Sequence, residues 1–395
     1  MSLKKPIRSL TWKNWLLLFL LTILLFVCFL FYNTGNFVFE GEGEVLTKLD
    51  NTREMISRKK YKPPYSFIFV NVAKDLELVK DENGGDNVIT DRQKLSSFFK
   101  ILADRNQHTY LIADIFFDIP SDHDNVLASE LRRLRHVVFP KHLSDSGILP
   151  SVITVPSAVA DYNTNTKRFS KFRLIYRDSL KTIPVIIHEE LQHVKYSTRS
   201  WGVFCNGSYC MQPIAPRYYI KPEQFIDSRD YPYFNLGDLL ILSGDSSFYD
   251  QFLKNRFILL GNFETDVHAT PVGKMPGTLI LLNTYLSLLN GKHQPSAWWF
   301  VTVFVLFFLI NLYLLFGEIK IPKIPDGKKW WQLFINNQVN GFLANFISIA
   351  ALCLLITIVS DFIFHVTPHT FIIFMYIIIY QGFTKYYNAW KKERN

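Results

Sequence analysis

The sequence predicts an α/β domain with a mainly parallel sheet, joined to an α-helical membrane portion of four transmembrane helices. Three observations predict this organisation. Hydrophobic residues make up 49% of the 395 residues and gather in blocks near the two ends. Lysine and arginine cluster beside those blocks. Between the blocks, short apolar runs alternate with stretches of helical periodicity. The length allows one sizeable folded domain besides the membrane segments.

The first apolar block, residues 15–32, carries no charge and would be about 27 Å long as a helix, close to the thickness of a bilayer core. A signal peptide is the alternative, but its apolar region is shorter and small residues follow it. Here Asn33 opens a polar stretch, so the block predicts an uncleaved anchor. Three later blocks predict further spans. The last is short enough for an interfacial or re-entrant segment instead.

The charge distribution gives the expected orientation. The formal net charge is +9, and basic residues gather at 4–13, 320–329 and 385–394, beside the apolar blocks. Such clusters mark the cytoplasmic side of a multi-pass cell-membrane protein, so they indicate a lipid bilayer rather than nucleic acid as the partner. The expected order is a cytoplasmic tail (1–14), a span (15–32), an extracytoplasmic domain (33–296), a span (297–317), a basic cytoplasmic loop (318–341), two spans (342–361 and 367–384) and a cytoplasmic tail (385–395).

The first half of the outward domain alternates strands and helices. Apolar runs predict strands at 66–72, 110–116 and 137–139, and the segments between them predict helices at 91–104 and 124–135. Thr90 is the expected N-cap of the first helix. Strands joined by helices in this way pair in parallel with right-handed crossovers.

The second half reads as more β-rich. Its expected strands lie at 151–155, 171–176 and 218–221, with a central strand at 257–260. Helices are expected at 183–194, 236–242 and 278–290, and a hairpin around Asn206-Gly207. A polar loop containing Glu264, Asp266 and His268 separates the central strand from the last helix.

Several stretches resemble the second type of CHASE domain, an extracellular sensory domain associated with cyclases and histidine kinases. They are Phe67-IFVNV, Thr90-DRQKLSSFFKIL, Ile112-ADIFFDIPSDHDNVLASEL, Phe234-NLGDLLIL and Phe257-ILLGNFETDVHATPVGKMPGTLILLNTYLSLLNG. The resemblance implies a sensory role, with one span before the domain and three after it. Members commonly continue into an output enzyme, whereas a short basic tail follows the last span here. The resemblance therefore implies sensing that is passed to a separate protein.

Carboxylates follow two of the predicted strands. Asp114, Asp118, Asp122 and Asp124 lie at the end of the 110–116 strand and beyond it. Ligands bind at the carboxyl edge of open parallel sheets, and carboxylates there can hold a hard cation. The alternative is that Asp124 caps a helix, that Asp118 and Asp122 shape a turn, and that Asp114 is paired, with Arg92 as a candidate partner.

The polar loop after residues 257–260 should reach the same edge. Glu264, Asp266 and His268 would then face the Asp114 group across a pocket, unless they only stabilise a turn. The residues that we expect to bind a ligand are Asp114, Asp118, Asp124, Asp266 and His268. No cofactor or metal is expected.

Two catalytic motifs fail on spacing. His188-EELQHV separates its histidines by five residues rather than four, so they would not reach one zinc ion from the same helix face. Val272-GKM lacks the serine or threonine and the earlier glycine of a phosphate-binding loop. We therefore expect no enzymatic activity.

Cys205 and Cys210 flank the hairpin turn and would pair as a disulfide in an oxidising compartment. The resulting hypothesis is a membrane-anchored extracytoplasmic sensory protein without its own output enzyme. It would signal through a cytoplasmic or membrane partner protein, and homo-oligomers are a further expected association. The alternative is a structural subunit or scaffold of a cell-envelope complex.

Overall fold

The computed structural model describes most of the chain outside its C-terminal quarter. The described residues are 2–3, 11–33, 61–80, 84–161, 169, 171–176, 180–200, 202–226, 230–243, 246–318, 351, 353–364, 366, 368, 370, 373 and 375–379. The chain divides into two compact units. One, the helical unit, comprises Met1–Glu42, Tyr209–Met211 and His293–Asn395, and the other, the α/β unit, comprises Gly43–Ser208 and Gln212–Lys292.

A six-stranded parallel sheet forms the centre of the α/β unit. Its strands, in spatial order, are β15 (Tyr233–Asn235), β2 (Phe67–Asn71), β16 (Phe257–Gly261), β5 (Tyr110–Ala113), β6 (Val137–Lys141) and β9 (Ser157–Val159). Every neighbouring pair runs parallel, which confirms the expected pairing. The strand expected at 257–260 does lie inside the sheet, since β16 pairs with β2 on one side and β5 on the other.

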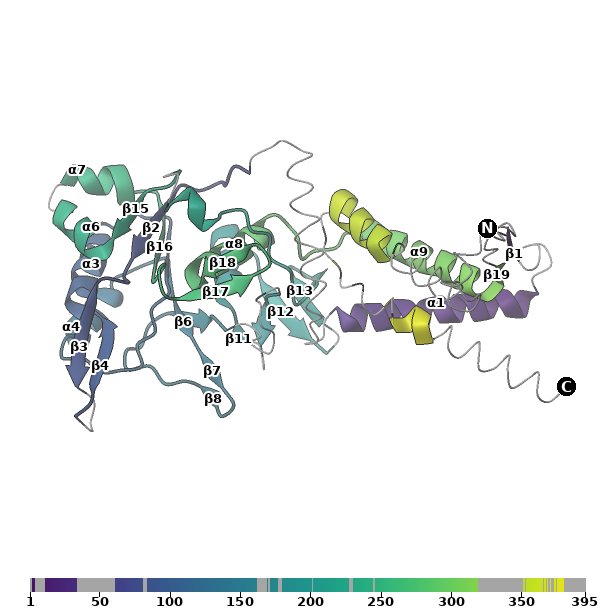
Figure 1. Ribbon diagram of the computed structural model, residues 1–395, viewed down its shortest axis with the longest axis horizontal. Helices are drawn as coiled ribbons and strands as arrows, with labels where there is room; N and C mark the ends of the chain where they lie inside the picture. Colours follow the sequence, from purple (N-terminus) through teal and green to yellow (C-terminus); the bar gives the residue numbers. More distant parts are fainter. Residues whose placement is uncertain are drawn as a thin grey trace, which may run out of the picture. The chain divides into compact units, whose positions relative to one another are not determined.

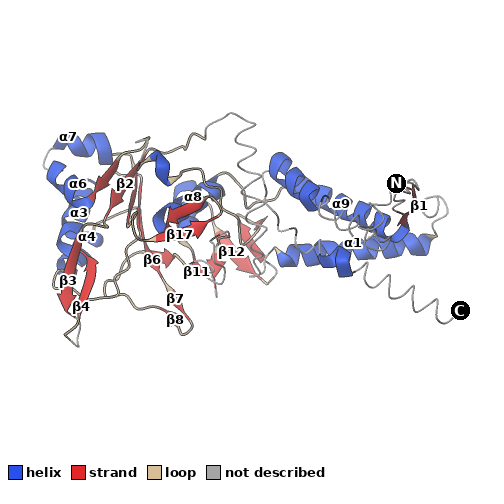
Figure 2. Ribbon diagram, in the orientation of Figure 1, coloured by secondary structure: helices blue, strands red, loops and turns tan. Residues whose placement is uncertain are grey.

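Helices cover both faces of this sheet (Figure 1 and Figure 2). On one face lie α3 (Arg92–Arg105), α4 (Asp124–Leu131) and α6 (Leu236–Leu242), whose apolar side chains share one core with the strands. On the other lie α5 (Ile183–Gln192) and α8 (Gly277–Leu289). Because both faces are covered, the central strands β2, β5 and β16 are buried along their whole length, as their unbroken apolar runs predicted.

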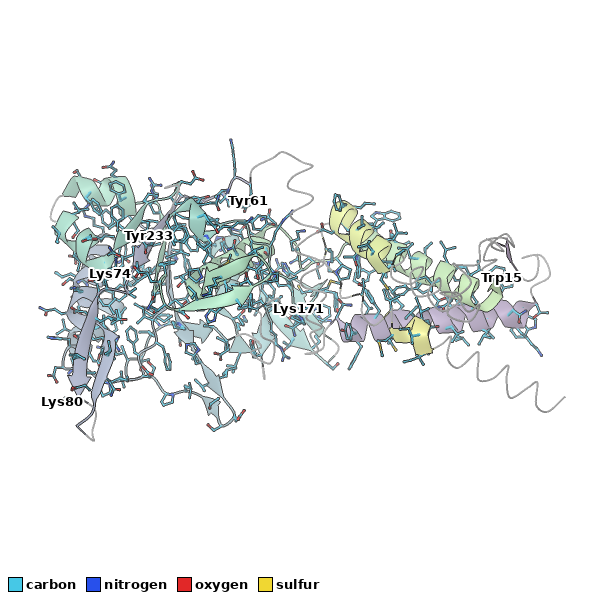
Figure 3. The ribbon with its side chains drawn as sticks, in the orientation of Figure 1. Trp15, Tyr61, Lys74, Lys80, Lys171 and Tyr233 are labelled. Atoms are coloured by element: carbon cyan, nitrogen blue, oxygen red, sulfur yellow. The ribbon has the colours of Figure 1, made fainter. Side chains whose placement is uncertain are left out.

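Small antiparallel ribbons and short turns complete the fold. These elements are β1 (Ser2–Leu3), β3 (Leu76–Lys80), β4 (Asp86–Thr90), β7 (Leu143–Ser144), β8 (Gly147–Ile148), β10 (Ile175–Tyr176), β11 (Leu180–Lys181), β12 (Tyr196–Arg199), β13 (Gly202–Cys205), β14 (Ser208–Cys210), η3 (Pro222–Gln224), α7 (Ser246–Phe248), η4 (Tyr249–Leu253), β17 (Val267–Thr270), β18 (Gly273–Pro276) and β19 (Gly317–Glu318). The turn predicted at Asn206-Gly207 is present, and both residues have the positive φ of such a hairpin turn. Lys80 lies at the end of the β3–β4 ribbon (Figure 3).

Several predicted elements are wrong. Asp91, not Thr90, caps α3, because its carboxylate accepts the Lys94 N–H at 2.9 Å while Thr90 ends strand β4. The polar loop after β16 is instead the β17–β18 hairpin. The strand expected at 110–116 stops at Ala113, since its neighbour β16 ends at Gly261 and offers no further partner.

Two expected strands do not form, because their backbone groups find other partners. In 218–221, the Ile220 N–H donates to the Asn283 side chain of α8 at 3.0 Å rather than to a strand. In 151–155, the Val152 N–H donates to the Phe117 carbonyl, and the segment runs into Pro156, which has no N–H to offer.

In the helical unit, α1 (Trp12–Tyr32) packs along α9 (Ala297–Phe316) through aromatic rings. Phe26 and Phe29 of α1 meet Phe304 and Phe307 of α9 edge to face, at 5.6 and 5.2 Å. Trp15, marked in Figure 3, stacks on Phe308.

The helical unit shows one helix, not four, that could span a bilayer. Among the described residues, α1 alone is long and apolar enough, and a helix of this kind fits a membrane anchor or a signal sequence. The other apolar helical segments with described side chains, Ala297–Leu312 and Cys353–Phe364, are shorter. Most of the spans expected at 342–361 and 367–384, the basic loop at 318–341 and the tail at 385–395 lie outside the described residues.

Candidate ligand-binding site

A cavity of about 620 Å³ opens at the carboxyl edge of the parallel sheet. The strands place its polar lining there: Asp114 directly follows β5, Asn262 follows β16, His142 follows β6 and Asp161 lies two residues beyond β9. This is where open α/β sheets bind ligands. The remaining polar lining residues are Thr90, Arg92, Asp118, Asp266 and His268, and the apolar lining includes Val72, Leu76, Val88, Ile89, Ile115, Ile119, Ile280 and Leu281.

Asp114 is the most strongly perturbed carboxylate of the cavity. Its N–H donates to the Leu260 carbonyl at 2.8 Å, which fixes the residue at the sheet edge. Its Oδ2 accepts the Thr278 hydroxyl from α8 at 3.0 Å. Burial, and then the charge of Asp266, raise the pKa of Asp114 to about 6, against the lowering effects of Thr278, His142 and His268. The partner suggested from the sequence, Arg92, is not the one found.

Asp266 and His268 meet Asp114 at the start of α8. His268 Nε2 lies 3.0 Å from Asp266 Oδ1. A Cβ on Gly277 would lie 2.6 Å from Asp266 Oδ2, 3.2 Å from Asp114 Oδ2 and 3.4 Å from His268 Nε2. The three side chains therefore converge on the bare Cα of Gly277, and a larger residue there would displace them.

A second imidazole–carboxylate pair, His142 and Asp161, lies on the opposite flank of the sheet edge. His142 Nδ1 lies 2.8 Å from Asp161 Oδ1, and Asp161 Oδ2 accepts the Leu143 N–H at 2.5 Å. The hydrogen bond to Asp161 raises the pKa of His142, and the charges of Asp114 and Asp266 add to this. Neither residue was expected to bind a ligand. A sequence signal exists, because His142 lies three residues after the expected strand 137–139 and Asp161 directly follows the short apolar run Ala158–Ala160.

Of the five residues expected to bind a ligand, four line the cavity and one does not. Asp114, Asp118, Asp266 and His268 lie along its wall, whereas Asp124 is absent from the described lining. Asp124 instead pairs with a buried cation and with the backbone. Its Oδ1 lies 3.4 Å from Arg92 Nε, and its Oδ2 accepts the Ser121 N–H at 2.8 Å.

Glu264 also lies elsewhere. Its Oε1 accepts the Asn71 side-chain amide at 2.9 Å and lies 3.6 Å from Lys74 Nζ, so it ties the loop after β16 to the end of β2. Asn71 in turn donates to Asn235 at 3.1 Å, which ties β15 to the same loop.

The chemistry of the cavity suits a polar ligand that carries positive charge. Four aspartates face one arginine and two histidines across its lining. As arranged, Asp114, Asp266 and His268 do not bring their ligand atoms within 4.8 Å of one another as a set, which is wider than the spacing around a bound metal. The apolar lining offers room for a hydrocarbon part beside the carboxylates.

Replacing Gly261 with alanine should lower the free energy of unfolding by about 2 kcal/mol, because the added methyl overpacks the site. A Cβ at this position would lie 2.1 Å from Thr278 Oγ1 and 3.4 Å from the Asp114 Cβ. The measurement is denaturant unfolding of the full chain in detergent. In the double variant, Thr278→Ala should restore part of the loss, since it removes the clashing hydroxyl. Strictly additive losses would contradict this explanation.

The predicted disulfide is not formed in the structure. Cys205 and Cys210 are both buried, and no disulfide joins any pair of described cysteines. The pairing stays a prediction for an oxidising compartment.

No protein-family model matches the chain, and neither the curated proteins nor the solved structures contain a match. The resemblance to the second type of CHASE domain thus rests on the quoted sequence stretches alone.

Proposed function

We propose that this chain is a membrane-anchored sensory protein whose α/β unit binds a small ligand in the cavity at its sheet edge. The observation that carries the proposal is the convergence of Asp114, Asp266 and His268 on Gly277, beside the His142–Asp161 pair. These residues come from five separate segments of the chain, and they bring together charges that folding alone does not need.

The unfavourable environment of the Asp114 carboxylate supports a ligand-binding role for the cavity. Asp114 is partly buried and lies beside a like charge, and both disfavour its ionised form. Strongly perturbed groups in a cavity are typical of functional sites. A ligand that carries a positive group would relieve the repulsion between Asp114 and Asp266.

The helical unit supports a multi-pass membrane anchor, as the sequence predicts. Its surface is apolar, and its interior combines an apolar cluster with several buried polar side chains that hydrogen-bond between helices, as in membrane bundles. Inside, Asn311 of α9 donates to Thr22 of α1 at 3.3 Å and accepts the Tyr376 hydroxyl at 2.8 Å, and Trp299 donates to Ser360 at 3.0 Å. The exposed apolar side chains include Leu16, Leu17, Leu20, Leu24, Val27, Val301, Val305, Leu309, Leu354, Leu355 and Ile363.

The proposed signal output is a separate protein. The basic segments at 318–341 and 385–395 are the proposed cytoplasmic contact surfaces, with residues 33–296 outside. No reaction is assigned to the α/β unit, and its resemblance to CHASE domains favours sensing. Ligand binding would bias α8, which leads in sequence through residues 290–296 into α9.

A thermal-shift screen of the purified full chain in detergent tests the proposal. The panel consists of small organic amines, amino acids and polyamines, measured on the wild type and on Asp114→Asn and Asp266→Asn. A ligand of the cavity should raise the unfolding midpoint of the wild type and lose at least tenfold in affinity in both variants, because each variant removes a charge that the ligand contacts.

Asp104→Asn is the matched control, since Asp104 is an exposed carboxylate of the same unit that pairs with Arg133. It should bind as the wild type does. Equal binding by all four proteins would place the ligand elsewhere. If no ligand emerges, Asp114, Asp118 and Asp266 prove freely replaceable, and deleting the gene abolishes an envelope complex, the protein would be a scaffold instead.

A further inference from the structure

We propose that Asp114 takes up a proton in the cavity, beside the carboxylate of Asp266, so that the charge of the ligand site, and with it ligand binding, changes as the surrounding solution is acidified. This inference rests on the proposed function, because it assigns a regulation to the same site. It follows from the geometry of the cavity and from the groups that surround Asp114.

The two carboxylates are close neighbours in a confined space. Their Oδ2 atoms lie 3.2 and 2.6 Å from one point, the position of a Cβ on Gly277. Asp114 is partly buried between the ends of β5 and β16 and the first turn of α8, which limits its contact with water. A carboxyl group in such a position ionises less readily when a second negative charge lies beside it.

The groups facing Asp114 from each neighbouring element are few. From α8 comes the Thr278 hydroxyl, from the β17 hairpin Asp266 and His268, and from the segment after β6 His142, which is held by Asp161. The charged groups whose fields act on Asp114 are Asp266, His142 and His268, and none is a lysine or arginine. Of the described lining residues, Arg92 is the permanent cation, and it lies beside Asp124 rather than Asp114.

The direction of the perturbation agrees with this geometry. The pKa of Asp114 is raised from its ordinary 3.8 to about 6 by burial first and by Asp266 second. Near neutral pH Asp114 is therefore charged, and below about pH 6 it becomes neutral. A cationic ligand should bind the charged pair and be released by acid, with one proton taken up as the ligand leaves.

The raised pKa of Asp114 also makes the free energy of unfolding depend on pH. A carboxyl whose pKa is raised in the folded protein adds stability that is fully present below pH 3.8 and is lost as the pH rises through about 6. The Asp114→Asn variant has no such group. Relative to the wild type, its folding equilibrium constant should therefore gain about a hundredfold between pH 4 and pH 7.

The comparison with the wild type is needed because other groups act in the opposite direction. Burial lowers the pKa of both His108 and His188 to about 4, so their contributions are lost as the pH falls below 6.5. Both histidines are present in the wild type and in the variant, so their effects cancel in the difference.

The experiment is a pH titration of the full chain in detergent, followed by infrared difference spectroscopy of protonated carboxyl groups. The probe is the proton itself. We expect a carboxyl band with a midpoint near pH 6 in the wild type and in Asp104→Asn. It should be missing from Asp114→Asn, and in Asp266→Asn its midpoint should fall by roughly one pH unit, because a like charge is removed. The second variant keeps the test valid if the first folds poorly.

A wild-type midpoint near pH 4, or an unchanged band in Asp114→Asn, would overturn the proton proposal. The two proposals fail in different ways. A ligand whose affinity is the same at pH 5 and pH 7.5 would overturn the regulation and leave ligand binding intact. A band that titrates near pH 6 in a protein that binds no member of the amine and amino-acid panel would support protonation of Asp114 and count against the proposed function.

Discussion

Replacing Phe257 with alanine is expected to lower the free energy of unfolding of the α/β unit by about 3–5 kcal/mol. Phe257 opens the central strand β16 and is fully buried. Its ring lies 5.5 Å from that of Phe67 on β2, 5.8 Å from Tyr110 on β5 and 5.7 Å from Tyr285 on α8. Because sheet hydrogen bonds fix two of these neighbours, the site cannot collapse around the missing ring, and a cavity remains.

Hydrogen exchange of the full chain in detergent, read out by mass spectrometry on peptides covering 66–72 and 257–261, measures this loss locally. Ile241→Ala is the control, since Ile241 is 82% exposed on α6 and its removal should change little. A Phe257→Leu variant should fall between the two. Protection in Phe257→Ala that equals the control would show that these aromatic contacts do not hold β16 in place.

The strands that the sequence predicts well are those buried on both faces. The residues of β2, β5 and β16 are uniformly apolar, and the only environment that suits such short runs between helices is the interior of a parallel sheet. The β3–β4 and β17–β18 ribbons escaped prediction because exposed ribbons impose no apolar pattern. Val267 and His268, for example, pair with Pro276 and Met275 across a hairpin that shows no alternation.

The candidate site was predictable as far as the ends of strands could be found. The sequence places Asp114 at the sheet edge because it directly follows the buried residues of β5. It places Asp266 at the same edge because the buried strand β16 ends five residues before it. His142 and Asp161 were not expected, because His142 lies three residues beyond the apolar part of β6 and the three-residue strand β9 was not predicted.

Asp124 was assigned to the ligand for a reason that the packing overturns. In the sequence it belongs to a row of aspartates, but in the fold it sits at the first turn of α4, where it faces Arg92 and the backbone of Ser121. The aspartates are close together in the sequence but do not form one cluster in space, because helix α4 begins at Asp124. Only tertiary contacts show that Asp118 lines the cavity whereas Asp124 balances the buried charge of Arg92, and the local sequence pattern does not contain this information.

Asp124→Asn should therefore lower the free energy of unfolding by about 3 kcal/mol, because it strands a buried cation. The Arg92 side chain is 1% exposed, and its remaining contacts are the Phe117 ring at 4.5 Å and a weak hydrogen bond to the Ile119 carbonyl at 3.5 Å. Burial already lowers the pKa of Arg92, and Asp124 is the main group that opposes this. Without that carboxylate, only the smaller effects of Glu77 and Asp118 offset the cost of burying the guanidinium.

A double-mutant cycle in denaturant unfolding of the full chain separates this cause from loss of the Ser121 contact. In an Arg92→Met background no charge is left to strand, so adding Asp124→Asn should cost about 1 kcal/mol, the value of the remaining hydrogen bond. If Asp124→Asn costs the same in both backgrounds, the carboxylate acts through the turn at Ser121 alone. Because Asp124 does not line the cavity, the variant should also keep the ligand affinity of the wild type under conditions where it is folded. That result would separate the residue that supports the cavity wall from Asp114 and Asp266, which face the ligand.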